Sequence, residues 1–474
     1  MENAELLKQT IESKDKKALN ELFKKVPAID LAEASGSLET EELIRIFREV
    51  EPSLSADYFT ELGQEQKEAL IKALTDKELV KLINSQAADD VTDAIVEMPA
   101  NLASRVMKAA DPDMREDLNE LLHYKKDTAG SIMTTEYLEF RENEKVEDAV
   151  KTIREKGRDA ETVYTIFVRD SSRRFLGTVD LDDLIFARPE QTLSEIMNKN
   201  VISCQTSDDQ EQVSQLFRRY DLNAIAVLNE DKRLVGVITI DDALDVLTEE
   251  GSEDIARLSA MEPAEKPYLT LSVWGNAKRC IPWIVVLLIL GTFTSMIISF
   301  FQDKLTGLAI LAAFIPTLLD TGGNSGSQTT GLMVRGLALG EFNAKHAGKV
   351  IFKELRTGVL VGLCVAAFAF VWFMIEQYTG IVSNSAFEGM NIWNGQCWTM
   401  EFFDSAAKVS GLVAISLFTA VTISKVIGAA LPILASLLKL DPALLSGPLL
   451  TTVMDIISLI IYFLIAMAFF PQLA

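Results

Sequence analysis

The sequence predicts a multidomain membrane protein with an all-α superhelical N-terminal domain, an α/β pair of repeats and a five-helix transmembrane domain. Three observations support this prediction. Acidic residues concentrate in the first half, a repeat of about 60 residues lies within 130–250, and long uncharged segments follow residue 280. A chain of 474 residues is also too long for one compact core.

Charge divides the chain into two halves of different character. Residues 1–265 contain 58 Asp and Glu against 33 Lys and Arg, a net charge of −25, whereas 266–474 has a net charge of +2. An acidic surface repels nucleic acid and attracts multivalent cations, so we expect no nucleic-acid partner. Solubility alone is the alternative explanation.

The cysteine and histidine content and the N-terminal residues argue against three further kinds of feature: a zinc site, a disulfide scaffold and a signal peptide. Four cysteines without a CxxC pair and two histidines argue against a zinc site or a disulfide scaffold. The first 17 residues are polar and charged and lack the apolar region of a signal peptide. The acidic half is therefore expected in the cytosol.

Residues 1–129 predict a superhelical bundle of short helices. Leu, Ile and Val recur at three- and four-residue spacing, and the segments are separated by Pro27, Pro52, Pro99 and Pro112. Asp89, Asp93 and Glu97 share one helical face, beside Asp90. Like charges at this spacing repel each other unless a cation intervenes, although solvated surface charges would give the same pattern.

Residues 130–195 and 196–245 form the two repeats. Ile132-Met133 matches Ile196-Met197, and FLGTVDLDDLI (175–185) matches RLVGVITIDDAL (233–244), with an amphipathic helix and a β-branched strand between these anchors. This order resembles a tandem pair of CBS domains, a family that often binds adenine nucleotides such as ATP. Its Ser/Thr-x-x-Asp pattern falls on Thr239 and Asp242, whereas the first repeat has Asp180 in the Thr position. The resemblance implies a tentative nucleotide site in the second repeat.

Residues 246–270 connect the second repeat to the membrane domain. The pattern over 241–261 predicts a helix with a strong excess of acids, opposed by Arg257 alone. Such an acidic rod beside a membrane path is a candidate gate.

Residues 271–474 contain five expected spans. Ile281–Phe301 is a run of 21 residues without charge, and about 20 are needed to cross the hydrocarbon core. The other spans are expected at Leu305–Val334, Thr357–Ile375, Val409–Leu438 and Pro442–Ala474. Bases flank the first span and separate the second from the third, whereas 376–407 holds four acids and no base. The positive-inside rule thus places the N-terminus in the cytosol and the C-terminus outside a cell (inner) membrane.

Asp455 is the outstanding ionisable residue of the spans. A charge at bilayer depth costs about 2.5–3.5 kcal/mol, and Thr451, Thr452 and Ser458 can share its polar stripe. Pro448 is expected to break the helix before it. This stripe is interpreted as the wall of an ion path. The alternatives concern Lys425, which either pairs with Asp455 or extends to the headgroups.

The segment 316–330 is unusually rich in glycine. Three glycines within five residues, following Pro316, predict irregular backbone whose freed carbonyls line a hydrated path together with Asn324 and Gln328. Close helix packing is the alternative for the glycines. Asp320 faces either the path or its cytosolic mouth.

Three motifs in the last half carry a family resemblance. The segments P-x-x-x-D-x-G-G-N-x-G-x-Q, R-G-L-A-L-G and D-P-A-L-L-S-G-P-L-L-T-T-V-M-D, which follow an acidic helical domain and a CBS pair, resemble the MgtE magnesium channels over essentially the whole chain. The resemblance implies a homodimer in membrane lipid whose central path holds hydrated Mg²⁺ at Asp455. It also implies regulatory Mg²⁺ ligands at Asp89, Asp93, Asp209, Glu211, Asp221, Asp242, Asp245, Glu250, Glu253 and Asp254.

The expected function is Mg²⁺ uptake down the electrochemical gradient, closed by cytosolic Mg²⁺. Mg²⁺ keeps several waters and prefers oxygen ligands, which suits the carboxylates, hydroxyls and amides of these segments. A broader transporter of Mg²⁺ and Co²⁺ and a non-conducting sensor are the alternatives. No nucleophile and base pair, and no Walker motif, points to an enzyme.

Overall fold

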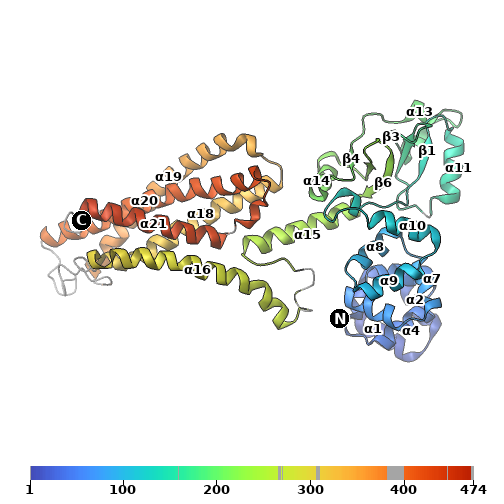
Figure 1. The fold of residues 1–474 in the computed structure, drawn as a ribbon, viewed down its shortest axis with the longest axis horizontal. Helices are drawn as coiled ribbons and strands as arrows, with labels where there is room; N and C mark the ends of the chain where they lie inside the picture. The colour runs from blue at the N-terminus through green and yellow to red at the C-terminus, as the bar shows by residue number, and fades with distance from the viewer. Residues whose placement is uncertain are drawn as a thin grey trace. The chain divides into compact units, whose positions relative to one another are not determined.

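The computed structural model describes residues 2–158, 160–264, 268, 271–305, 310–379, 381, 400–445 and 447–470, without the side chains of residues 2, 37 and 302–305. The chain divides into two compact units, Met1–Thr248 and Glu249–Ala474. Figure 1 shows helices alone in the N-terminal domain and in the membrane unit, and strands in the region between them. The three expected fold types are confirmed.

Short helices make up the N-terminal domain, and its prolines begin helices rather than merely separating them. Pro27 and Pro99 precede α3 and α9, and Pro52 and Pro112 are the first residues of α5 and α10, where a missing N–H costs no hydrogen bond. The helices are α1 (Glu2–Ser13), α2 (Lys16–Lys25), α3 (Ala28–Ala34), α4 (Thr40–Glu49), α5 (Pro52–Thr60), α6 (Gln64–Ala73), α7 (Asp76–Ile83), α8 (Ala88–Val96), α9 (Ala100–Ala109) and α10 (Pro112–Leu121).

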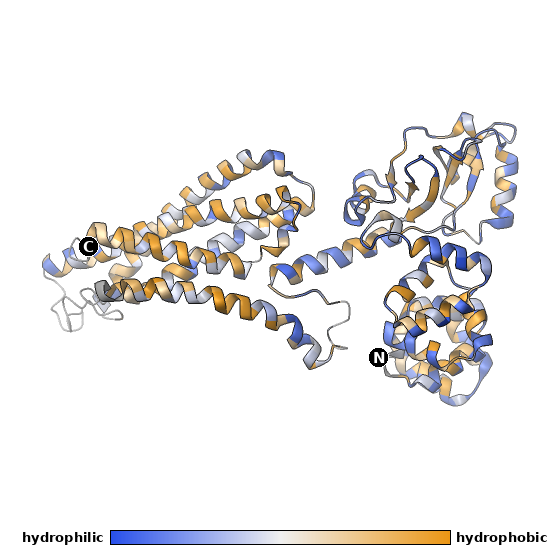
Figure 2. Ribbon diagram, in the orientation of Figure 1, coloured by the Kyte–Doolittle hydropathy of each residue, from blue (hydrophilic) through white to orange (hydrophobic). Residues whose placement is uncertain are grey.

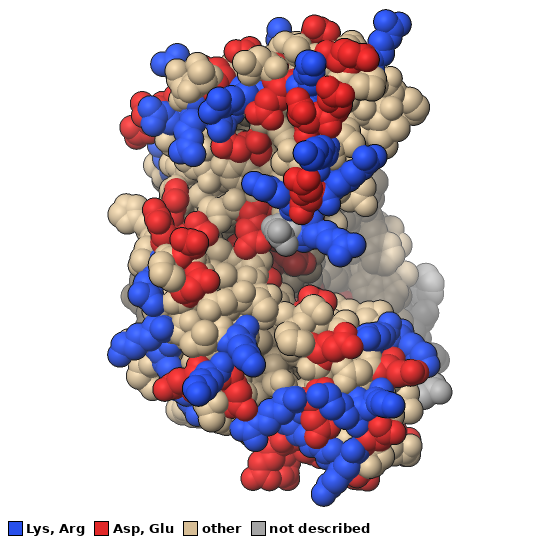
Figure 3. All heavy atoms as spheres, turned by 90° about the vertical axis from the view of Figure 1, so that its right-hand side faces the viewer, with Lys and Arg blue, Asp and Glu red and all other residues tan. Residues whose placement is uncertain are grey.

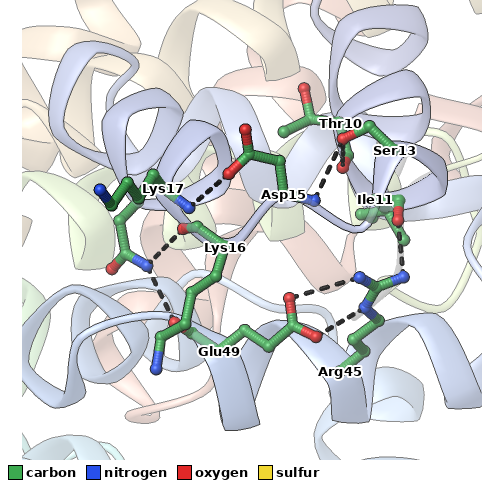
Figure 4. A network of polar contacts seen from close by, with 9 residues as sticks. Thr10, Ile11, Ser13, Asp15, Lys16, Lys17, Arg45 and Glu49 are labelled. Atoms are coloured by element: carbon green, nitrogen blue, oxygen red, sulfur yellow. Dashed lines mark hydrogen bonds and ion pairs between the residues drawn. The ribbon is translucent and has the colours of Figure 1, made fainter.

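Packing between alternate helices produces the superhelix. Helix α1 packs on α3, α3 on α5, α5 on α7, and α7 on α9. Polar contacts tie the first turns of this series together (Figure 4). Arg45 donates to the carbonyl of Ile11 at 2.6 Å and to Glu49 at 2.9 Å, while Asp15 caps α2 by accepting from the backbone N–H of Lys17.

The two repeats have the same topology and the same register. In the first sheet β1 (Glu139–Arg141) is parallel to β2 (Thr165–Arg169), which is antiparallel to β3 (Phe175–Asp180). The second sheet repeats this with β4 (Ser203–Gln205), β5 (Ala224–Leu228) and β6 (Leu234–Thr239). Gly177 and Gly236 occupy equivalent positions opposite Val168 and Val227. Their helices are α11 (Val146–Lys156), α12 (Leu181–Phe186), α13 (Leu193–Ile196) and α14 (Gln210–Tyr220).

Each repeat is completed by a segment that lies outside its own run of strands. Thr134, which precedes the first strand of the first repeat, exchanges two backbone hydrogen bonds with Val237 in β6, at 2.8 and 3.0 Å. Ala129 donates to the carbonyl of Asp208, and Met133 packs in the core of the second repeat. Asn198 pairs in the same way with Thr178 in β3. The segment 127–134 therefore packs with the second repeat, although it precedes the strands of the first.

Helix α15 (Ile240–Leu258) continues from β6 as a single helix of 19 residues, as the acidic pattern predicts. It begins in the first unit and ends in the second. In the second unit, Arg257 forms ion pairs with Glu253 of the same helix and with Asp441 in the segment between α20 and α21. The end of the acidic helix is thus attached to the membrane unit.

The membrane unit is helical, and Figure 2 shows that its long helices are mostly hydrophobic. Its elements are α16 (Val273–Leu305), α17 (Ile310–Ala313), α18 (Ile315–Ala338), α19 (Ala347–Thr379), α20 (Met400–Leu437) and α21 (Gly447–Phe469). Among the described residues four helices are long and apolar enough to cross a membrane, namely α16, α19, α20 and α21. The expected number of five spans is not confirmed, because the glycines and polar residues of α18 lower its hydropathy.

Two local predictions for this unit are wrong. Pro448 is the second residue of α21, so it begins this helix instead of breaking it. The glycine-rich segment forms the continuous helix α18, with Pro316 in its first turn, so its carbonyls are not freed by irregular backbone. Helix α18 packs along both α20 and α21.

Candidate cation sites

A cluster of carboxylates lies where the N-terminal domain meets the repeats. Ala88, at the start of α8, packs in the core of the second repeat, and this contact places Asp89 beside Asp242 of α15 and Glu161 of the first repeat. Figure 3, which views the molecule from the right-hand side of Figure 1, shows Asp and Glu side chains around a hollow. Three separate segments thus bring their carboxylates together.

The carboxylates of this acidic cluster repel one another and are partly removed from water. Burial, together with the charges of Asp90, Asp242 and Glu161, raises the pKa of Asp89 to about 8. Partial burial with Asp242 and Asp241 raises the pKa of Glu161 to about 7. Burial raises the pKa of Asp242 to about 6, although Thr239 donates to it at 2.6 Å. Each shift shows that ionisation here is unfavourable without a cation.

One oxygen of Asp89 shows where in the cluster a cation would bind. Asp89 Oδ1 is buried and has no hydrogen-bond partner in the described part of the chain. An unpartnered buried carboxylate oxygen is costly, and a hard divalent cation would satisfy it together with the oxygens of Asp242 and Glu161. The donor set is all oxygen, which fits Mg²⁺.

The neighbouring acids on α8 have a different environment. Burial lowers the pKa of Lys67, whereas Asp90, Asp93 and Glu97 act to raise it, so its ammonium group lies among these three carboxylates. Lys67 also lies over the ring of Phe59, 5.8 Å from its centroid. The repulsion expected along Asp89, Asp93 and Glu97 is therefore relieved in part by a lysine that the sequence pattern did not connect to α8.

The other expected regulatory ligands are distributed along α14 and α15. Asp209 caps α14 by accepting from the backbone N–H of Gln212, and Asp221 ends that helix with a left-handed backbone, φ 52°. Glu211 accepts from Gln215 at 3.0 Å. The side chains of Asp209 and Glu211 thus have local partners on α14, and Asp221 ends this helix through its backbone.

Within α15 the expected ligands divide between the two units. Burial is the largest cause of the raised pKa of Glu61 in the N-terminal domain, and the charge of Asp245 also raises it. Glu253 pairs with Arg257, and Asp254 has a raised pKa because it is partly buried and close to Glu250. Glu161, Glu61 and Asp241 are acids of the first unit that sequence reasoning missed.

In the membrane unit, α18 has two contrasting faces. Gly322, Gly323 and Gly326 are buried against the neighbouring helices. Asp320, Asn324 and Gln328 follow each other at four-residue spacing on the exposed face. Asn324 donates to Asp320 at 3.0 Å. The exposed face therefore carries a polar row, Asp320, Asn324 and Gln328, in the middle of a hydrophobic unit.

Asp455 lies beside this polar row. Its carboxylate interacts electrostatically with that of Asp320, and Asp455 Oδ1 is buried without a hydrogen-bond partner in the described residues. Ser458 Oγ and Ser325 Oγ are likewise buried and unpartnered. Two interacting carboxylates and these unsatisfied hydroxyl oxygens form a second group of oxygen donors, which suits a hard cation.

The two threonines before Asp455 are already hydrogen-bonded. Thr451 donates to the carbonyl of Gly447 at 2.9 Å and lies 3.2 Å from Ser327 Oγ on α18. Thr452 donates to the carbonyl of Pro448 at 3.0 Å. Ser458 is fully buried against Gly322. The stripe Thr451 to Ser458 thus packs against α18, and Asp455 lies at its edge.

The glycines of α18 and α20 permit this close packing. A Cβ atom on Gly323 would lie 2.5 Å from Thr451 Cγ2, one on Gly326 would lie 2.5 Å from Ser424 Oγ, and one on Gly428 would lie 2.6 Å from the carbonyl oxygen of Gly326. The packing alternative for the glycines is therefore correct.

We expect Gly428→Ala to separate α18 from α20 and to destabilise the protein by about 1–3 kcal/mol, because the new methyl group meets backbone rather than a movable side chain. Denaturant titration of the purified protein in mixed micelles measures this loss. Gly331→Ala on α18 is the control, since a Cβ there has nothing within 4 Å. Equal stability of the two variants would contradict the close approach of the backbones.

Lys425 takes neither of its two expected positions. It is only 6% exposed and donates to Thr329 Oγ1 at 3.1 Å, so it neither reaches the headgroups nor pairs with Asp455. Thr329 in turn lies 3.4 Å from an oxygen of Glu354, which is 7% exposed. A buried chain of Lys425, Thr329 and Glu354 thus joins α20, α18 and α19.

Comparison with known proteins accounts for the whole chain. Residues 315–465 match the MgtE family model, described as a divalent cation transporter, 26–127 match the MgtE intracellular N domain, and 129–190 and 193–249 match the CBS domain. The magnesium transporter MgtE of Thermus thermophilus is 32% identical over 467 residues, 97% of each chain. That of Bacillus subtilis is 30% identical, covering 95% of this chain and 91% of its own.

Solved structures resemble about half of this chain. The soluble part of a magnesium transporter has a TM-score of 0.50 and 27% identity, covering 52% of this chain and 98% of its own. The cytosolic domain of the Mg²⁺ channel MgtE in complex with ATP has a TM-score of 0.49 and 33% identity, covering 52% and 100%. Since the matches extend from the acidic helical domain to the last hydrophobic helix, this chain belongs to the MgtE family of magnesium transporters.

Proposed function

We propose that this protein transports Mg²⁺ across a cell membrane through a path lined by the polar row of α18 and by Asp455. The observation that supports this most directly is the facing pair of Asp320 and Asp455, in a unit where charge is costly and no described cation balances them. Hydrated Mg²⁺ needs oxygen ligands and little dehydration, which two carboxylates, the amide oxygens of Asn324 and Gln328 and nearby hydroxyls provide.

The exposure of the polar row supports a homodimer. Asp320, Asn324 and Gln328 are exposed on the single chain, and such a row does not face lipid in a stable protein. A second copy would enclose it as a water-filled path and would make α18 the fifth span, with the N-terminus cytosolic and the C-terminus outside. Exposed apolar residues at equivalent places in the repeats, Ile185 at 68% and Leu244 at 55%, offer a second surface for the same partner.

We also propose that cytosolic Mg²⁺ binds the acidic cluster of Asp89, Asp242 and Glu161 and favours the closed state. The unpartnered Asp89 Oδ1 supports this assignment. Asp93, Asp209, Glu211, Asp221, Asp245, Glu250, Glu253 and Asp254 remain further candidate ligands from the family resemblance. Several weak sites acting together would give a steep response at millimolar Mg²⁺.

An adenine nucleotide at the second repeat is a separate proposal. Asp242 is held by Thr239 in the Ser/Thr-x-x-Asp arrangement, where a carboxylate accepts from ribose hydroxyls. The surrounding acids repel phosphates, so we expect ATP to bind this site more tightly when Mg²⁺ accompanies it. Equilibrium dialysis of ATP with and without Mg²⁺ measures the difference.

Flux into vesicles tests transport. Protein reconstituted in liposomes with an inside-negative potential should take up Mg²⁺ without ATP, with uptake lowered when Mg²⁺ bathes the cytosolic domains. Competition by Co²⁺ distinguishes selective from broader divalent transport. A sensor that does not conduct would give no uptake at any Mg²⁺ concentration, and this result would overturn the proposal.

Substitution of Asp89 tests regulation through pH. Mg²⁺ must displace a proton from Asp89 below pH 8 and a second one from Glu161 below pH 7, so the apparent affinity should fall about tenfold per pH unit between pH 8 and pH 7 and more steeply below pH 7. Without metal the raised pKa sets the sign: the contribution of Asp89 to stability is complete below about pH 4, the value for the unfolded chain, and is lost as the pH rises to about 8. Asp89→Asn should remove the part of both effects that lies between pH 7 and pH 8, above the pKa values of Glu161 and Asp242.

The measurement is the melting temperature of the full-length protein with and without Mg²⁺ at pH 6, 7 and 8. Asp148→Asn, on exposed α11, is the control that removes one equal charge. If Asp89→Asn keeps the Mg²⁺-dependent rise in melting temperature and its pH dependence, the cluster is not the regulatory site.

A further inference from the structure

Helix α19 has one face that packs on protein and one that does not. Glu354, Gly358, Gly362, Ala369 and Phe373 are buried, and α19 packs along α20. The opposite face exposes large apolar side chains along most of its length, among them Leu360 at 65%, Leu363 at 56% and Val371 at 57%. In a helix of this hydropathy such a face contacts lipid chains.

The exposed face changes to cationic at its cytosolic end. Lys349, Lys353 and Arg356 continue the row of Leu360 and Leu363 at helical spacing, and all three are exposed. Lys345 extends the row into the segment before α19. The only acid of this stretch, Glu354, points to the buried side. Figure 2 shows the first turns of α19 as hydrophilic and most of the rest as hydrophobic. We call Lys345, Lys349, Lys353 and Arg356 the basic row.

The four cations of the basic row have no acidic partner among the described residues. By contrast, Arg257 pairs with Asp441, and Arg335 lies 3.6 Å from Glu341. Within the described part of this unit, no carboxylate lies within 4.0 Å of a basic-row nitrogen. Four adjacent cations without counter-ions repel one another and attract a polyvalent or repeated anion.

An exposed aromatic ring lies within the row. Phe352 is 60% exposed, and the Arg356 guanidinium lies 6.0 Å from the centroid of its ring. A phenyl ring and a guanidinium group side by side suit the boundary between acyl chains and headgroups. A soluble anion would use the cations but would leave Phe352, Leu360 and Leu363 without an occupant.

We propose that the basic row binds the phosphodiester groups of anionic phospholipids, whose acyl chains then lie along Leu360 and Leu363. The apolar row continues directly from the cationic one, so one lipid molecule can contact both. The interaction joins α19, which carries Glu354 of the buried chain, to the inner leaflet. The site thereby makes the stability of the membrane unit depend on lipid charge.

Native mass spectrometry with added phosphatidylglycerol tests the proposal. The triple variant Lys349→Gln, Lys353→Gln, Arg356→Gln should bind this lipid roughly 100-fold more weakly than wild type, because each charge near the surface contributes about fivefold. Phosphatidylcholine should bind both proteins equally. The control variant Lys151→Gln, Arg154→Gln, Lys156→Gln removes the same charge from α11 of the cytosolic unit.

Melting temperatures separate the lipid from other partners. Phosphatidylglycerol should raise the melting temperature of wild type and of the control variant but not that of the triple variant, and inorganic phosphate should raise none. Equal melting temperatures in phosphatidylcholine show that the triple variant is folded. The proposal is overturned if phosphatidylglycerol still raises the melting temperature of the triple variant, or if inorganic phosphate raises that of wild type by the same amount. It is also overturned if the triple variant is equally destabilised in phosphatidylcholine, because the basic row would then interact with acidic residues of the protein instead of lipid.

Discussion

Asp455→Asn should reduce Mg²⁺ uptake by reconstituted protein to the level of protein-free vesicles. The substitution keeps the size of the side chain and removes its charge. Two unit charges about 4 Å apart interact by about 4 kcal/mol at an effective dielectric constant of 20, and about 1.4 kcal/mol is a factor of ten. A divalent ion interacts more strongly, so the loss should exceed about 100-fold.

The fold should not suffer from this substitution. Asp455 Oδ1 has no hydrogen-bond partner in the described residues and faces Asp320, so an amide relieves repulsion and the melting temperature should stay the same or rise. Asp404→Asn is the matched control, since Asp404 is exposed and pairs with Lys408 at 2.6 Å. Uptake by Asp455→Asn at the wild-type rate and with the same Mg²⁺ dependence would exclude Asp455 from the path.

Lys425→Met and Glu354→Gln should each destabilise the membrane unit by about 3–5 kcal/mol. Thr329 on α18 contacts both Lys425 on α20 and Glu354 on α19. Each single change removes one of these two opposite charges and leaves the other buried without compensation. The double variant should lose less than the sum of the two, because no buried charge then remains.

Unfolding in mixed micelles provides the three free-energy differences of this double-mutant cycle. Lys408→Met, which breaks an exposed pair, should cost no more than about 1 kcal/mol. Small and strictly additive losses for Lys425 and Glu354 would show that the two charges do not depend on each other.

The sequence predicted those features that depend on local periodicity. Spacing of apolar residues gave the N-terminal helices, matched anchors gave the two repeats, and long uncharged runs gave the hydrophobic helices. Pro448 and the glycine segment were misread because the same residues break a helix or begin and pack one. Which of these happens depends on the neighbour, here Thr451 against Gly323 and the Gly326 carbonyl against Gly428.

The candidate sites could be predicted only in part, for a similar reason. Asp89, Asp242 and Asp455 were visible as acids in distinctive patterns. Glu161 lies between α11 and β2 with no pattern of its own, and only the fold brings it to Asp89. Lys67 and Glu354 likewise gain their roles from elements that are distant in sequence. Long-range charge pairing leaves no signal in a single sequence.

The exchange of segments between the two repeats constrains how the chain folds during synthesis. The first repeat has all of its pieces within 135–198, so it can close once this stretch has left the ribosome. Thr134 leaves earlier but has its partner, Val237, about one hundred residues later. The segment 127–134 therefore stays unpaired until the second repeat has been synthesised, which is after the first sheet can form. A gene fragment that ends between the repeats would leave this segment without a partner.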